Sequence, residues 1–161
     1  MALFSRSRDL PPALRELLRK EAALAWAHHS GGDIAATRRG IVSVDQHETL
    51  TLAWGDLIQA VWSPPMLSVV SIRDGSSHAH GWILDDPGQV PTVIRDRVSH
   101  NVVADHMRTF TPGGIVRFVA RRDGANVEWV SLPQDHEWAA TEIGRRSITN
   151  ELADLRSSLG V

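Results

Sequence analysis

The feature that most constrains this chain is the stretch from Glu48 to Ile72, which reads as consecutive short strands separated by turns. In residues 49–54, threonine and alanine alternate with leucine and tryptophan. This period of two is typical of a half-buried strand. Residues 66–72 are rich in β-branched side chains, which favours another strand.

Turn signals divide the same stretch. Gly55-Asp56 predicts a tight turn, because glycine adopts turn conformations easily and aspartate can bond its own backbone. Ser63-Pro64-Pro65 ends the run before it, since proline lacks a backbone donor. That run, residues 57–62, fits either a short buried strand or a helical turn.

The rest of the chain adds layers around this stretch. Further strands are predicted over residues 23–29, 33–37, 40–44, 78–83, 101–110, 115–121 and 125–132. The segments 33–37 and 40–44 form either one bent strand or a hairpin. Helices are predicted over residues 9–23, 90–99 and 136–159, where apolar residues recur at helical spacing.

These elements predict an α+β fold. We expect a bent antiparallel sheet or small barrel of about seven strands, with the N-terminal helix and the long C-terminal helix packed on it. Residues 24–132 are then mainly β, with a short helix near 90–99. At 161 residues, the chain has the size of a single domain, 1–161, and residues 1–8 are expected to form a flexible tail.

Composition limits the classes of function. The chain has no cysteine, which excludes disulfides and thiolate chemistry and suits the cytoplasm. Its formal net charge is −2, whereas nucleic-acid-binding domains are usually strongly basic, so we expect no nucleic-acid partner. No apolar run reaches the roughly 18 residues of a transmembrane helix.

Two groups of residues are candidate binding sites. His78 and His80 alternate on a predicted strand, which places both imidazoles on one face, as in some metal sites. Arg38-Arg39 and Arg121-Arg122 follow or interrupt strands. If the sheet brings these pairs together, they form an anion-binding edge for phosphate, a lipid headgroup or RNA. The other interpretation of both groups is a solvated strand end.

No catalytic motif is present. The glycine pairs at 31–32 and 113–114 match neither a Walker loop nor a dinucleotide-binding loop, and no Gly-x-Ser-x-Gly elbow occurs. The sequence therefore indicates no cofactor and no catalytic residue.

The segments ATRRGIVSV (residues 36–44) and TLAWGDLIQAVW (51–62) resemble bacterial pleckstrin-homology-like domains of an uncharacterised actinobacterial type. The resemblance covers residues 23–72 and the final helix. It implies a bent sheet closed by a C-terminal helix, and a binding or scaffolding module without catalytic residues.

We therefore predict a non-enzymatic binding module that recognises a protein or an anionic group. One alternative is a metal-dependent or acid/base enzyme that uses His78 and His80. Another is a homodimeric structural subunit that associates through a sheet edge or the final helix.

Overall fold

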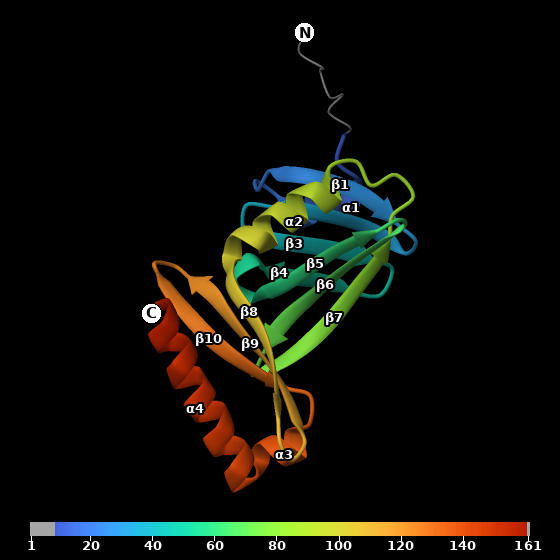
Figure 1. Cartoon of the computed structure of the whole chain (residues 1–161). Helices are drawn as coiled ribbons and strands as arrows, with labels where there is room; N and C mark the ends of the chain where they lie inside the picture. Colours follow the sequence, from blue (N-terminus) through green and yellow to red (C-terminus); the bar gives the residue numbers. More distant parts are fainter. Residues whose placement is uncertain (1–8, 161) are drawn as a thin grey trace.

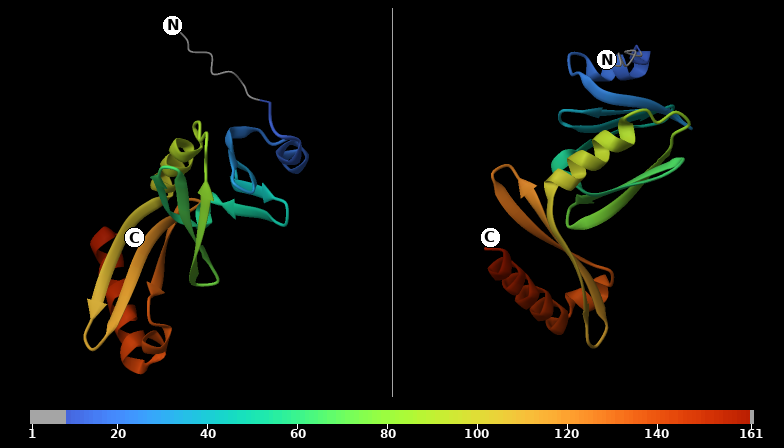
Figure 2. Two further views of the ribbon diagram at one scale, coloured as in Figure 1. Left: turned by 90° about the vertical axis from the view of Figure 1, so that its right-hand side faces the viewer. Right: turned by 45° about the horizontal axis from the view of Figure 1, so that its top comes forward.

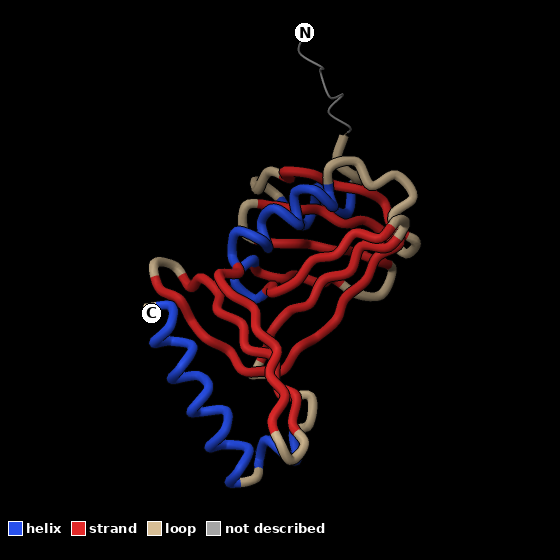
Figure 3. Tube along the Cα trace, in the orientation of Figure 1, coloured by secondary structure: helices blue, strands red, loops and turns tan. Residues whose placement is uncertain are grey.

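The computed structural model describes residues 9–160, in which ten strands form three antiparallel sheets accompanied by four α-helices (Figures 1 and 3). The expected tail, residues 1–8, lies outside the described residues.

Sheet A is an up-and-down meander of the first four strands. Its strands are β1 (Ala23–His29), β2 (Gly32–Thr37), β3 (Gly40–Asp45) and β4 (Thr49–Ala53). The segments predicted near 33–37 and 40–44 are therefore a hairpin. Helix α1 (Pro12–Leu18) covers one face of this sheet, where Leu14 and Leu18 pack on Ala35 and Val42.

Sheet B follows after a 3-10 turn, η1 (Trp54–Asp56). Its strands are β5 (Leu57–Ser63), β6 (Met66–Arg73) and β7 (Ser76–Ile83). The ambiguous run at 57–62 is thus a strand. Asp74 and Gly75 both have positive φ (52° and 73°) in the turn before β7, which suits a tight hairpin turn with Gly in its second position.

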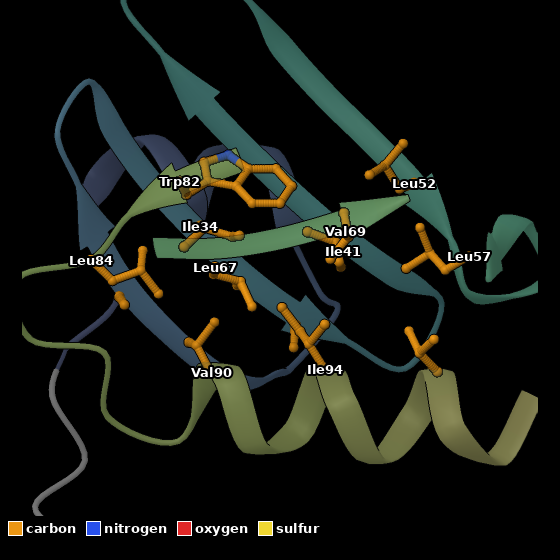
Figure 4. Close-up of a cluster of buried hydrophobic side chains, with 13 residues drawn as sticks. Ile34, Ile41, Leu52, Leu57, Leu67, Val69, Trp82, Leu84, Val90 and Ile94 are labelled. Atoms are coloured by element: carbon orange, nitrogen blue, oxygen red, sulfur yellow. The ribbon is translucent and has the colours of Figure 1, made fainter. Parts of the chain in front are cut away.

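The main core lies between sheet A, sheet B and α2 (Val90–Asn101). Val90, Ile94 and Val98 form the buried face of α2. Figure 4 shows Val90 and Ile94 pointing from the helix toward Leu67 of sheet B and Ile34 of sheet A. The short helix predicted near residues 90–99 is therefore α2, which covers the main core.

The C-terminal third forms a separate layer. Sheet C contains β8 (Val102–Phe110), β9 (Gly114–Asp123) and β10 (Asn126–Pro133), with β9 in the middle. One face of it packs on α4 (Glu142–Leu159) through Phe118, Trp129 and Leu155. On its other face, Val119 and Leu132 pack with Ile58 and Ile72 of sheet B. Figure 2 shows sheet C and α4 at the opposite end of the molecule from α1.

The predicted fold class is wrong. There is no single sheet or barrel of about seven strands in residues 9–160, and the final helix does not cover one: it covers only sheet C. The physical reason is that strands β9 and β10 of sheet C bury one face against α4 and the other against sheet B. Alternation along a strand identifies the strand but does not identify the layer against which it packs.

The predicted C-terminal helix is also two helices, α3 (His136–Ala140) and α4. Thr141 separates them, and its hydroxyl accepts a hydrogen bond from the Gly144 N–H at 3.0 Å, as an N-cap does. A side chain on Gly144 would collide with the Trp138 carbonyl, 2.1 Å from an added Cβ. This glycine therefore allows the two helices to meet closely.

Candidate functional site

The candidate site is a recess between the β1–β2 turn and the β3–β4 turn, with a volume of about 720 Å³. This volume lies in the range of ligand-binding clefts. The residues that line it come from the segment before and into α1 and from the two hairpins: Pro11, Pro12, His28, His29, Ser30, Gly31, Gly32, Asp33, Asp45, Gln46 and His47.

A smaller hollow of about 160 Å³ adjoins the recess and shares Asp45 with it. Its other lining residues come from sheet A, the β3–β4 turn and sheet B: Ser43, Glu48, Leu50, His80, Gly81 and Trp82. The titratable side chains of both hollows are imidazoles and carboxylates, and within the described part of the chain neither hollow is lined by lysine or arginine.

His29 is held at both ring nitrogens. Its Nδ1 accepts a hydrogen bond from the Gly31 N–H at 3.1 Å, and its Nε2 lies 3.1 Å from the Ser43 hydroxyl. A nitrogen that accepts from an amide carries no proton, so the neutral ring has its proton on Nε2 and donates it to Ser43. Burial lowers the pKa of His29 below its ordinary value of 6.5, although Asp33 and Asp45 oppose this shift.

Ser43 joins three strands at this point. Its hydroxyl oxygen accepts from Trp82 Nε1 of β7 at 2.9 Å and from His29 of β1. Ser43 itself lies in β3 and is only 5% exposed. Because His29 donates to this hydroxyl, it does not act as a base toward it, which a nucleophilic serine would require.

The carboxylates of the recess are fixed by local bonds. Asp33 Oδ1 lies 2.5 Å from His28 Nδ1, its neighbour across the β1–β2 hairpin. Asp45 Oδ1 accepts the N–H groups of His47 and Glu48, each at 2.7 Å. These two bonds lower the pKa of Asp45 below its ordinary value of 3.8, so this carboxylate is ionised at neutral pH.

His80, one of the two predicted metal ligands, lies in the smaller hollow. Its Nε2 is 2.9 Å from the hydroxyl of the buried Ser71, and its ring stacks on Trp82 with centroids 6.3 Å apart. Burial lowers the pKa of His80 from 6.5, and the charges of His78 and Arg73 act in the same direction. In residues 9–160 no group of three or more His, Cys, Asp or Glu is placed to hold a metal ion.

These shifts predict a loss of stability in acid. The unfolded chain binds protons at His29 and His80 near pH 6.5, whereas the folded chain binds them only at a lower pH. The unfolded state therefore binds more protons between these values, and the free energy of unfolding falls as pH falls through this window. We expect urea midpoints to fall between about pH 7 and pH 5, and to fall less in the H29Q/H80Q double variant. Equal losses in both proteins would contradict this assignment.

Two arginines of the predicted anion-binding site, Arg121 and Arg122, already donate hydrogen bonds to other groups of this chain. Arg121 donates to Glu128 Oε2 at 2.9 and 3.2 Å and to the Gly55 carbonyl oxygen, and Asp56 lies 3.6 Å away. Arg122 Nε donates to the His100 carbonyl oxygen at 3.2 Å. Arg121 therefore already faces carboxylates.

The other arginine pair lies on the turn between β2 and β3. Arg38 and Arg39 are exposed there. The Arg39 carbonyl oxygen accepts from the Trp54 N–H in η1, the same turn that Arg121 contacts through Gly55. One residue of each pair, Arg39 and Arg121, thus contacts η1. Anion binding by the two pairs stays a prediction.

One signal in the sequence could have located part of the recess. Ser30-Gly31 is typical of a turn, and a two-residue turn there places His28 opposite Asp33, which is the observed register. The contact of Ser43 with Trp82 had no such signal, because these residues are 39 positions apart.

Comparison with known proteins gave no significant match to any family model, curated protein or solved structure. Within residues 9–160, no helix has the length and apolar character needed to cross a membrane.

Proposed function

We propose that this protein is a non-enzymatic binding module that recognises a protein partner by a basic side chain placed in the recess. The observation that supports this proposal is the charge of the lining: Asp33 and Asp45 line the recess, Glu48 lines the adjoining hollow, and no described lysine or arginine balances them there. A guanidinium or ammonium group supplies positive charge and donates hydrogen bonds to carboxylates, here chiefly to Asp45, because Asp33 already contacts His28.

The hydrogen bonds of the recess favour binding over chemistry. Asp45 is held by two backbone N–H groups, and His29 by Gly31 and Ser43. Such fixed acceptors are preorganised for a ligand, which reduces the entropy lost on binding. The resemblance of residues 23–72 to pleckstrin-homology-like domains implies a binding module as well.

The anionic ligand that the sequence also suggested has weaker support. Arg121 is close to two carboxylates, Glu128 and Asp56, and an anion would have to compete with them. The enzyme based on His78 and His80 and the homodimeric subunit stay predictions without a further observation in their favour.

The proposal is tested by titrating the labelled full-length chain with two short blocked peptides, one containing arginine and one containing glutamate. We expect the arginine peptide alone to shift the amide signals of Gly31, Gly32 and His47 in NMR spectra. Asp45→Asn should weaken this binding at least about tenfold, since it removes a charged hydrogen-bond acceptor.

The matched control is Asp74→Asn, an exposed turn residue outside both hollows. Its φ of 52° is one that asparagine tolerates. The amide oxygen introduced by D45N can still accept from the two backbone N–H groups, so this variant should keep the fold, which circular dichroism checks. Equal shifts with both peptides, or unchanged affinity in D45N, would refute recognition of a basic group by this recess.

A further inference from the structure

We propose that His29 acts as a proton-operated latch, which holds the β1–β2 turn against the junction of sheets A and B when neutral and releases it when protonated. The latch does not depend on any ligand, so it stands or falls separately from the function proposed above.

The geometry of the neutral state defines the latch. Nδ1 of His29 accepts from Gly31 in the turn, while Nε2 donates to Ser43, which also accepts from Trp82 of sheet B. Between His29 and Gly31, the Ser30 N–H donates to the Ile83 carbonyl oxygen of β7 at 3.2 Å. The ring of His29 therefore lies among the bonds that connect the β1–β2 turn with β3 and β7.

Protonation is incompatible with one of these bonds. The second proton goes to Nδ1, the atom that accepts from Gly31, and two N–H groups would then face each other across 3.1 Å. Either the ring or the Gly31 amide must move. The atoms nearest to a Cβ built on Gly31 belong to the side chains of Asp45 and His29, at 3.6 Å, and not to the backbone.

The surrounding charges determine where the charged ring moves. Asp33 of β2 and Asp45 of β3 both attract it. The other titratable groups that line the two hollows are His28, His47, Glu48 and His80. Once Nδ1 is protonated it cannot accept from Gly31, so the turn loses this bond as the ring approaches either carboxylate.

The latch has a consequence for the recess, which rests on the proposed function. His29, Ser30 and Gly31 line it, so release changes its shape. Protonated His29 also adds a positive charge beside the carboxylates Asp33 and Asp45. Acid should thus release a bound basic group.

The test is a pH titration of the full-length, ¹⁵N-labelled protein without ligand, between about pH 8 and pH 5. We expect one set of NMR signals to shift with the signals of the His29 ring, at a common midpoint below pH 6.5: those of the Gly31 amide, the Ser30 amide and the Trp82 indole N–H. Hydrogen-exchange protection of Gly31 should fall by about fivefold, as for the loss of one hydrogen bond. Amides of sheet C should not follow this step.

Two variants separate His29 from its neighbours. His29→Gln keeps a donor for Ser43 but cannot titrate, so the common step should vanish. His28→Gln changes the adjacent exposed histidine, with a side chain 67% exposed, and should leave the step in place. The latch is refuted if the step disappears in H28Q and persists in H29Q. It is also refuted if the Trp82 indole signal does not shift together with the Gly31 amide signal in the unmodified protein. The second criterion applies even if H29Q does not fold.

Discussion

Replacing Phe118 with alanine is expected to lower the free energy of unfolding by about 3–5 kcal/mol, the range for removing a large buried aromatic side chain. Phe118 is fully buried at the centre of β9. It belongs to the cluster that joins sheet C to α4 through Trp129 and Leu155, and its ring meets Phe110 edge-on at 6.4 Å. The cavity left by alanine would lie in the small core that holds the C-terminal layer together.

Urea denaturation followed by tryptophan fluorescence measures this loss. Ile143→Ala is the control, because Ile143 is 60% exposed on α4 and its truncation should change stability by no more than about 0.5 kcal/mol. A loss below about 1 kcal/mol for F118A would mean that α4 and sheet C are not held together by this cluster.

Gly32→Ala is expected to have the next largest effect, a loss of roughly 3 kcal/mol, at the upper end of the range for overpacking. An added Cβ would lie 1.9 Å from the Val44 carbonyl oxygen and 2.9 Å from the Asp45 Cα. Both obstacles are backbone atoms of the paired strand β3, so no side-chain rotation relieves the collision. The register that places Asp45 in the recess should be disturbed as well.

The matched control for this substitution is Gly55→Ala in η1. No atom lies within 4 Å of a Cβ added to Gly55. Thermal unfolding should therefore distinguish the two variants clearly, with G55A close to the unmodified protein. If the two variants unfold at the same temperature, β2 and β3 do not approach each other at Gly32 as described.

Local patterns predicted the strands and turns well where the chemistry of a turn is unambiguous. The Asp-Gly pair at 74–75 forms the β6–β7 turn, whereas at 123–124 only the glycine lies in the turn, because Asp123 ends β9 and pairs with Asn126; the two glycines have φ of 73° and 60°. The alternation in residues 49–54 corresponds to β4, except that Trp54 lies in η1, and the β-branched residues 66–72 correspond to β6. These features depend on neighbouring residues alone.

The arrangement of layers could not be predicted in this way. The role of α2 depends on contacts between Ile94 and residues such as Ile34 and Leu67, far away in the sequence. The same holds for the tryptophans. Trp82 and Trp129 are equally buried, at 7% exposure, but they belong to separate cores, which their neighbours in the sequence do not indicate. The recess also depends on tertiary contacts, because Ser43 meets Trp82 only when sheets A and B come together.

Helix α2 runs into β8 without an intervening loop, since the helix ends at Asn101 and the strand begins at Val102. Side chains brace this joint: Asn101 Nδ2 donates to the Trp54 and Leu57 carbonyl oxygens, and Arg122 donates to that of His100. The helix and the strand therefore form one continuous element that connects the main core to the C-terminal layer, in addition to the packing of Val119 and Leu132 on sheet B.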